Sequence, residues 1–236
     1  MRLLLTRPEP DAQRTAAALR AQGHDVITAP LLRIEPAPEA QFDTGPWAAI
    51  LITSANAASA VAVHARMTEL LALPVFAVGR RSAGAMAAAG FADVTSADGN
   101  VSELVRLVGA RLRPAARLLY LAGEDRSGNL AGDLRARGFA VETAVIYRAV
   151  AATRLPPAAA QALAGGVDGV LHFSRRSAEV FVDAARAAGV LESALQAAHY
   201  CLSAPIGEPL AKAGAADIRV AERPNEALLL ALIAAA

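Results

Sequence analysis

Small and hydroxyl-bearing residues gather at six places in the chain, each directly after a short apolar run. These places are Thr6–Arg7, Thr53–Ser54, 79–82, 123–127, 174–177 and Ser203. Serine and threonine are common helix N-caps, so each place taken alone predicts only the start of a helix. Helix N-termini also present free amide groups and partial positive charge. Six of them together therefore favour a site for an anionic organic molecule.

Tyr147, in the segment VIYRAV, is a candidate for proton transfer. The ordinary pKa of a phenol is about 10, so the side chain is protonated near neutrality and can donate a hydrogen bond to a departing oxygen. The alternative interpretation is an amphipathic aromatic side chain that packs where two domains meet.

Familiar motifs for metals and cofactors are missing. GEDRSGN (123–129) has Asn129 where a phosphate-binding loop needs lysine, and GRRSAGAM (79–86) fails in the same way. Cys201 is the only cysteine and the histidines are scattered, which excludes the usual zinc patterns. We expect His172 and Cys201, both in apolar runs, to be core residues. The expected site uses no metal and no cofactor.

Composition limits the remaining classes of function. The 236 residues are 55% apolar and 19% charged, enough to build one large or two small packed domains. The net charge of +1 argues against a nucleic-acid partner. We found no apolar stretch of about 18 residues, so no membrane span is expected. The opening MRLLLTRPEP is too short for a signal-peptide core, which predicts a cytoplasmic protein.

The chain repeats itself in three segments that keep their order. Leu3 to Arg33 aligns with Leu118 to Arg148, and the match includes LRAQGHDV against LRARGFAV. Ala48 to Val61 aligns with Asp168 to Phe181. Phe76 to Val94 aligns with Tyr200 to Ile218. Three matches in order indicate an architectural duplication.

Each repeated unit has the pattern of a strand, a loop and a helix. The apolar runs LLLT, AILIT, VFAV, LLYLA, GVLHF and YCLS predict buried parallel strands. Alternation with alanine-rich helices predicts two similar α/β domains, each a doubly wound parallel sheet. Glycines stand where those helices should stop, at positions 23, 90, 138, 189 and 214.

Two proline-bounded segments, 30–38 and 144–157, predict linker strands between the domains. The first domain would combine residues 1–34 with 151–236, and the second would be 38–145. The chain would then cross between domains twice. Ligands bind such domains at the carboxyl ends of the strands, and a cleft between domains is a favoured site.

Seven motifs in this order resemble the uroporphyrinogen-III synthase family: LLLTRPEP, ILITSANAA, VFAVG, LLYLAGEDR, VIYRAV, VLHFSRRSAEVF and PNEALLLAL. The resemblance covers nearly the whole chain. It implies two flavodoxin-like α/β domains joined by a two-stranded linker, which agrees with the repeat. It also implies a reaction without a cofactor: linear hydroxymethylbilane loses water, inverts ring D and closes to uroporphyrinogen III. Two positions depart from the family pattern, Ala55 in place of a frequent proline and Ile206 in place of a hydroxyl residue.

On this resemblance, Tyr147 is the expected catalytic residue, assisting departure of the terminal hydroxyl. The expected substrate contacts are Arg7, Thr53, Ser54, Asn56, Gly79, Ser82, Gly123, Arg126, Ser174 and Ser203. The alternative to substrate binding for Arg7 and Arg126 is that each is an ordinary arginine of the protein surface. We expect a monomer whose partner is the polycarboxylate substrate, with no nucleic acid and no membrane. The alternatives for the whole chain are a noncatalytic two-lobed binder of an anionic small molecule and an inactive relative of the synthase.

Overall fold

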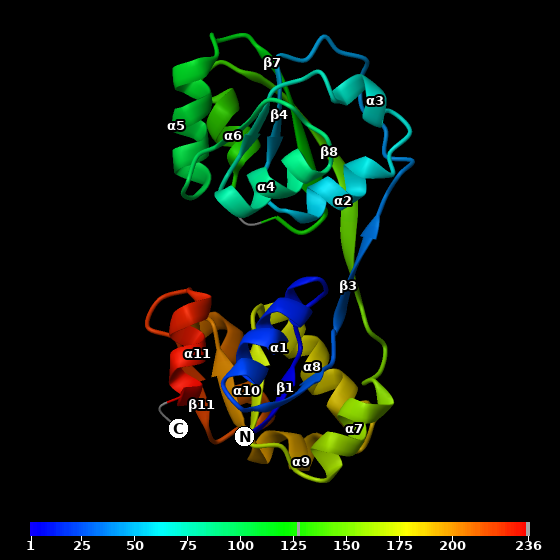
Figure 1. Ribbon diagram of the computed structural model, residues 1–236, viewed down its shortest axis with the longest axis vertical. Coiled ribbons are helices and arrows are strands. Elements are labelled where there is room, and N and C mark those ends of the chain that lie inside the picture. The colour runs from blue at the N-terminus through cyan, green and yellow to red at the C-terminus, as the bar shows by residue number, and fades with distance from the viewer. Residues whose placement is uncertain (127, 235–236) are drawn as a thin grey trace. The chain divides into compact units, whose positions relative to one another are not determined.

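The computed structural model describes residues 1–126 and 128–234 (Figure 1). Residue 127, which belongs to the small-residue loop at 123–127, lies outside the described residues. The chain divides into two compact units, unit 1 with residues 1–33 and 150–236 and unit 2 with residues 34–149. Each unit has a parallel sheet at its centre with helices packed on it. The predicted fold class of two similar α/β domains is confirmed.

Unit 1 has a five-stranded sheet of the order β2-β1-β9-β10-β11, in which all neighbours are parallel. In chain order this is 2-1-3-4-5, a doubly wound arrangement. The strands are β1 (Arg2–Leu5), β2 (Asp25–Thr28), β9 (Gly169–His172), β10 (Ala198–Cys201) and β11 (Ile218–Val220).

Helices cover both faces of the unit 1 sheet. One core contains Leu4 and Val170 with four helices, and the other contains Leu3 and Leu171 with two. The first group is α7 (Pro157–Ala164), α8 (Arg175–Ala187), α9 (Leu191–Gln196) and α10 (Ala204–Ala213). The second is α1 (Asp11–Ala21) and α11 (Glu226–Ala234). Because both faces are buried, the strands are continuous apolar runs.

Unit 2 has the strand order β3-β8-β7-β4-β5-β6. The strands from β8 to β6 are parallel along this order. The strands are β3 (Leu32–Pro36), β4 (Ala49–Ile52), β5 (Val75–Ala77), β6 (Val94–Ser96), β7 (Arg117–Gly123) and β8 (Ala140–Ala151).

The helices of unit 2 also lie on two faces. Ile50 and Ile52 pack towards α2 (Asn56–Ala62), α3 (Met67–Leu70) and α4 (Arg80–Ala88). Ala49 and Leu51 pack towards α5 (Val101–Arg111) and α6 (Leu130–Arg135). Successive residues of one strand therefore serve opposite cores, as the strand period of two requires.

The sequence repeat holds at the level of strand register. Leu3 pairs with Gly169 in unit 1, and their aligned positions, Leu118 and Ala49, pair in unit 2. The pairs between β9 and β10 match those between β4 and β5 in the same way. The duplication that the sequence predicted is confirmed, and it extends to which residues face each other across the strands.

The chain changes unit within β3, between residues 33 and 34, and within β8, between residues 149 and 150. These two strands are neighbours in the sheet. The amide of Ala37 donates to the Ile146 carbonyl at 2.7 Å, and the amide of Ala152 donates to the Leu31 carbonyl at 2.9 Å. Ascending positions on one strand meet descending positions on the other, so the pair is antiparallel.

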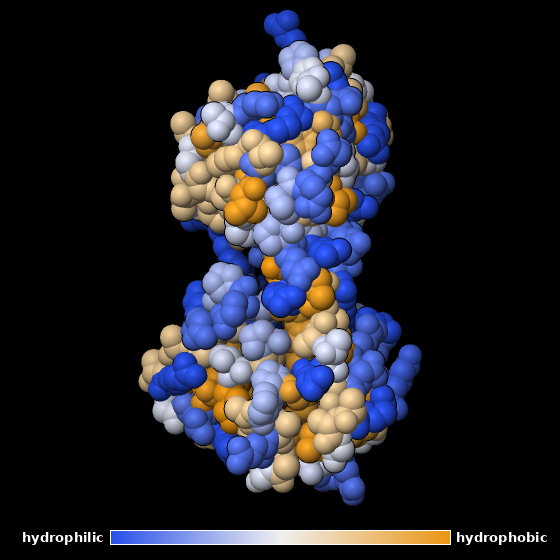
Figure 2. All heavy atoms as spheres, turned by 90° about the vertical axis from the view of Figure 1, so that its right-hand side faces the viewer, coloured by the Kyte–Doolittle hydropathy of each residue, from blue (hydrophilic) through white to orange (hydrophobic). Residues whose placement is uncertain are grey.

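The five glycines expected to end helices all have positive φ, from 70° at Gly189 to 104° at Gly90 and Gly214. This left-handed conformation is the usual helix stop. Within the described ranges, no helix is long and apolar enough to cross a membrane. The described large apolar side chains that are exposed are Met1, Val63, Val145 and Val220. The face in Figure 2 intersperses hydrophilic and apolar residues. Much of the apolar content thus lies in the cores.

Candidate active site

A cavity of about 410 Å³ opens at the carboxyl edge of the unit 2 sheet. Its walls come from the residues that follow β4, β5, β6 and β7, together with parts of β3 and β8. They are Ile34, Thr53, Ser54, Asn56, Val78, Asn100, Val101, Glu124, Asp125, Arg126, Tyr147 and Ala149. The adjacent strands β4 and β7 continue into helices on opposite faces of the sheet. Such a switch point is where doubly wound sheets bind ligands.

Five of the residues expected from the sequence meet in this cavity: Thr53, Ser54, Asn56, Arg126 and Tyr147. They come from three separate stretches of chain, and strand order alone brings them together. The cavity therefore has both the predicted proton donor and a set of polar side chains around it.

Tyr147 is almost completely buried, with 8% of the residue exposed. Burial raises the pKa of its phenol, and the charge of Asp125 acts in the same direction, while a hydrogen bond with the Ser54 side chain opposes them. The phenol is therefore protonated across the physiological range and is available as a hydrogen-bond donor.

A second tyrosine supports the β4 edge of the cavity. The Tyr120 hydroxyl lies 2.8 Å from the Thr53 hydroxyl, and Tyr120 is buried in the core beneath. The sequence did not single out Tyr120, because it lies within the apolar run LLYLA and has the pattern of a core strand residue. Ser54 accepts from the amide of Asn56 at 3.2 Å. Thr53 and Ser54 are thus both fixed by hydrogen bonds.

The loop after β7 gives the cavity a mixed charge. Glu124, Asp125 and Arg126 all line it, and all three are exposed. Arg126 also lines a neighbouring cavity of about 190 Å³ beside α6. The two acidic residues were not expected from the sequence, because a small-residue loop at 123–127 predicts an anion site. Carboxylates in a cavity expected to suit an anion restrict which part of a ligand can lie there.

Three predicted contacts in unit 2 do not line this cavity. Gly79 is the N-cap of α4, with extended backbone and open space where a side chain would be. Ser82 lies in the first turn of the same helix and is buried. Gly123 lies behind the cavity, against the ring of Tyr147.

Arg7 in unit 1 is tied into its own unit. Its guanidinium pairs with Asp11 at 3.0 Å and Glu226 at 2.9 Å, and donates to the Thr15 hydroxyl at 2.8 Å. It also lies over the Phe173 ring, 4.1 Å from the ring centre. These contacts join the loop after β1 to α1 and α11, which gives Arg7 a clear structural role.

The two predicted serines of unit 1 both stand at helix starts. Ser174 is the N-cap of α8, and its hydroxyl accepts from the amide of Ser177 at 3.1 Å. Ser203 is the N-cap of α10, without a side-chain capping bond. Ser174 thus does what serine does at many helix starts, while the Ser203 hydroxyl has no such capping role.

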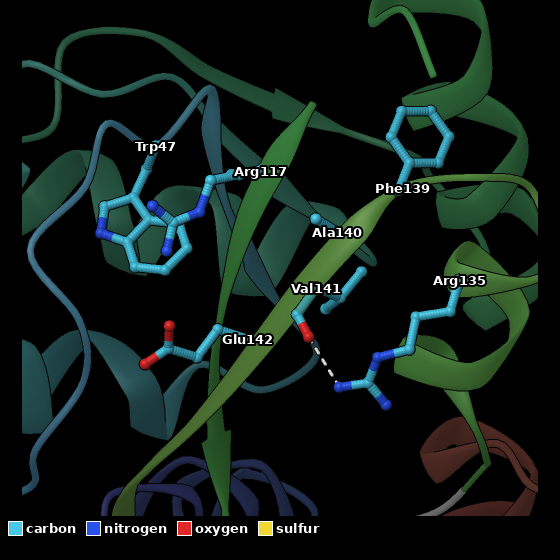
Figure 3. Close-up of a pocket in the computed structure, with 7 residues that line it drawn as sticks. All are labelled: Trp47, Arg117, Arg135, Phe139, Ala140, Val141 and Glu142. Atoms are coloured by element: carbon cyan, nitrogen blue, oxygen red, sulfur yellow. Dashed lines mark hydrogen bonds between the residues drawn. The ribbon is translucent and has the colours of Figure 1, made fainter. Parts of the chain in front are cut away.

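A further cavity in unit 2, of about 380 Å³, lies at the opposite edge of the sheet, where β7 and β8 begin (Figure 3). Arg117 stacks on Trp47, 4.6 Å from the ring centre, and pairs with Asp43 at 3.2 Å. Arg135 donates to the Val141 carbonyl at 2.6 Å, drawn as the dashed line in Figure 3. Both arginines of this cavity thus already contact other groups of the protein. No predicted site residue lines the cavity.

No group of three or more histidine, cysteine, aspartate or glutamate side chains within residues 1–126 and 128–234 could hold a metal ion. His172 and Cys201 are buried in the unit 1 core, as predicted. Burial raises the pKa of the Cys201 thiol to about 12, so it is not a reactive thiolate.

Comparison with known proteins agrees with these features. The family model described as uroporphyrinogen-III synthase HemD matches residues 13–231. No curated protein matches the chain significantly. Among solved structures, the uroporphyrinogen-III synthetase of Helicobacter pylori matches with a TM-score of 0.70 at 18% identity, over 100% of this chain and 99% of that one. A mutant uroporphyrinogen III synthase of Thermus thermophilus matches with a TM-score of 0.52 at 18% identity, over 100% and 98%. These likenesses show a shared fold, and the family match shows more: the chain belongs to the uroporphyrinogen-III synthase family, enzymes of haem biosynthesis that act on a polypyrrole.

Proposed function

We propose that this chain cyclises hydroxymethylbilane to uroporphyrinogen III, with loss of water and inversion of ring D. The observation that carries the chemical part is Tyr147, a phenol kept protonated by burial at the wall of the unit 2 cavity. The overall change makes the enzyme a cyclising lyase. We propose that it works as a cytoplasmic monomer.

The charges of the cavity suggest which part of the substrate enters it. The substrate implied by the family has eight carboxylate arms, and Glu124 and Asp125 would repel them. The pyrrole N–H groups and the reacting ring, which gains positive charge as its hydroxyl leaves, suit the same two carboxylates. We infer that the terminal ring that carries the hydroxymethyl group enters this cavity and that Arg126 binds a carboxylate arm at its rim.

The first step breaks the bond between the terminal methylene carbon and its hydroxyl oxygen. Tyr147 donates its proton to that oxygen, which leaves as water with the bonding electron pair. The electron pair of the pyrrole nitrogen stabilises the resulting cation, and Glu124 and Asp125 stabilise its charge. A proton later lost from the ring system restores the phenol, so that one water is released per product and the enzyme is unchanged.

The second part of the reaction is selection between two ring closures. Unaided cyclisation gives the uninverted type I isomer, as the family resemblance implies. The already substituted carbon of ring D attacks the cationic terminal methylene and forms a spiro intermediate. The bond from that carbon to its bridging methylene then breaks. The free carbon of ring D bonds to the released methylene and loses its proton, so the ring closes inverted. We propose that holding the folded chain in position favours this attack. Arg7, Gly79, Ser82, Ser174 and Ser203 stay predictions as contacts for the acid arms.

The direct test uses purified protein and freshly made hydroxymethylbilane, with oxidation of the products and separation of the type I and type III porphyrins. Predominant type III, formed at a rate proportional to protein, is the expected result. Type I alone, at the spontaneous rate, would contradict the proposal and favour a noncatalytic binder or an inactive relative.

Replacing Tyr147 with phenylalanine tests the acid role. We expect Tyr147→Phe to slow type III formation at least about tenfold, within the range that general acid catalysis contributes. The matched control is Tyr200→Phe in unit 1, because the Tyr200 hydroxyl is buried and has no hydrogen-bond partner. Its removal should leave turnover unchanged. Equal turnover of Tyr147→Phe and the wild type would exclude the acid role.

A further inference from the structure

We propose that Gly123 is a positioning residue for Tyr147: it gives the tyrosine ring its place, because no other residue leaves room for that ring. The effect on turnover rests on the proposed function, whereas the effect on the ring itself does not.

The distances show how closely the two residues pack. A Cβ atom built on Gly123 would lie 2.6 Å from Cε2, 2.7 Å from Cζ and 2.9 Å from the hydroxyl oxygen of Tyr147. Carbon atoms in contact prefer about 3.5–4.0 Å. The conflict involves the reactive end of the ring, so any substituent at Gly123 must displace the phenol itself.

The backbone of Tyr147 is fixed, so the side chain must absorb that displacement. The register between β7 and β8 shifts here: Ala122 faces Val145, and Gly123 faces Tyr147, which leaves Ile146 as one extra residue on β8. The Ile146 carbonyl accepts from the amide of Ala37 at 2.7 Å, and the Tyr147 carbonyl accepts from the amide of Glu124 at 3.0 Å. Bulges of this kind re-aim side chains next to functional sites.

The internal repeat supports a linked role for the two residues. The aligned segments place Pro8 at the position of Gly123 and Leu32 at the position of Tyr147. In unit 1 the equivalent strands, β1 and β2, pair only as far as Leu5 and Thr28, so the unit has neither this residue pair nor the register shift. The glycine, the tyrosine and the register shift that brings them together therefore occur together in unit 2.

Unit 1 offers a matched control at another glycine. A Cβ on Gly169 would lie 2.6 Å from Cε2 and 3.2 Å from Cδ2 of Tyr200. The steric conflict is of the same kind, but it lies in the sheet of unit 1, and neither Gly169 nor Tyr200 lines the unit 2 cavity. Gly169→Ala should therefore disturb packing as much as Gly123→Ala does, without moving Tyr147.

The experiment compares both variants with wild type by turnover, melting temperature and titration of isotope-labelled tyrosine rings in nuclear magnetic resonance. We expect Gly123→Ala to lower kcat at least tenfold with KM within about twofold, because a misplacement of about 1 Å can cost 100-fold. The phenol should also lose part of its burial, so its pKa should fall towards the ordinary value of about 10. Gly169→Ala should keep the wild-type kcat and the wild-type titration of Tyr147.

A double variant separates positioning from general damage. If Gly123 acts through Tyr147, adding Gly123→Ala to Tyr147→Phe should cause no further loss of kcat. Unchanged kcat and unchanged titration in Gly123→Ala would overturn the proposal, as would an equal loss of kcat in Gly169→Ala. If no protein in the set forms type III product, the proposed function fails, and the titration still decides whether Gly123 positions the ring.

Should Gly123→Ala fail to fold, the variant Gly123→Ala/Tyr147→Leu provides the test. Leucine ends before the three ring atoms in conflict, so this variant should fold with a melting temperature near that of Tyr147→Leu alone. Failure of the double variant to fold, beside a folded Tyr147→Leu, would overturn the proposal.

Discussion

Units 1 and 2 share one strand register and differ in what stands at the ends of the strands. Ser54 in unit 2 contacts the Tyr147 phenol, whereas its aligned residue in unit 1, Ser174, caps a helix. After β7 the loop lines a cavity, whereas after β1 the loop contributes Arg7 to an ion-pair network. The scaffold can therefore be duplicated without duplicating its chemistry, which depends on a few side chains at the edge of the sheet.

Among single substitutions in unit 1, the replacement of Arg7 should lower the stability most. We expect Arg7→Ala to lower the free energy of unfolding by about 3 kcal/mol, because Asp11 and Glu226 lose a partner in a largely buried setting. Urea denaturation would measure the loss. The control is Arg14→Ala, which pairs with the same two carboxylates from a side chain that is 53% exposed. It should lose less than about 1 kcal/mol, and an equal loss in both variants would contradict a structural role specific to Arg7.

A fall in pH should also lower the stability of unit 1 through a histidine pair that unit 2 lacks. His172 Nε2 lies 3.1 Å from His199 Nδ1 in the unit 1 sheet, where their aligned residues in unit 2 are Ile52 and Val75. Burial lowers the pKa of His199 to about 4, and burial and the neighbouring ring lower the pKa of His172 well below its ordinary value. Unfolded histidine binds protons near pH 6.5. The contribution of this pair to the stability of unit 1 is therefore fully present above about pH 6.5. It is lost as the pH drops towards 4.

We expect each of these two histidines to cost unit 1 on the order of 2 kcal/mol of unfolding free energy between pH 7 and pH 5. Denaturation curves at the two pH values would measure it. The control is the variant His172→Ile/His199→Val, which borrows the residues of unit 2 and should lose less stability over the same range. The same pH dependence in this variant would assign the acid sensitivity to other groups.

The smallest expected effect concerns helix starts. Ser174→Ala removes a hydroxyl that accepts from the Ser177 amide, and should cost about 1 kcal/mol of unfolding free energy. Ser203→Ala is the control, since that serine makes no capping bond with its side chain. Thermal denaturation of both variants measures the difference. Equal melting temperatures would show that the Ser174 hydroxyl contributes no stability to unit 1.

The sequence predicted the scaffold well for a physical reason: apolar runs and glycines at helix ends report burial and backbone conformation, which are local. The alignment of Leu3 with Leu118 therefore carried through to paired strands in both units. Tyr147 was also singled out from the sequence, because it lies in a predicted linker strand between two domains, and the structure places it in the wall of the unit 2 cavity.

The side chains around Tyr147 were harder to predict. Tyr120 lies in an apolar run and gave no signal of its hydrogen bond to Thr53. Gly123 was expected to touch substrate, whereas the structure places it against a tyrosine ring. A bulge at Ile146 sets that contact, and the continuous apolar run AVIY (144–147) does not show which of its residues is the extra one. Contacts between distant segments depend on such details.

The division of the chain also affects the order in which the two units can fold during synthesis. Unit 2 is one continuous segment, whereas the β1 strand of unit 1 lies between β2 and β9, whose residues are separated by the whole of unit 2. On the ribosome, unit 2 can be completed while β1 still has one open edge. Domains fold as units while the chain emerges. The first strand made, β1, can therefore pair along its second edge only after β9 has been made. A premature stop between residues 150 and 168 would therefore spare the tyrosine cavity and leave β1 of unit 1 with one unpaired edge.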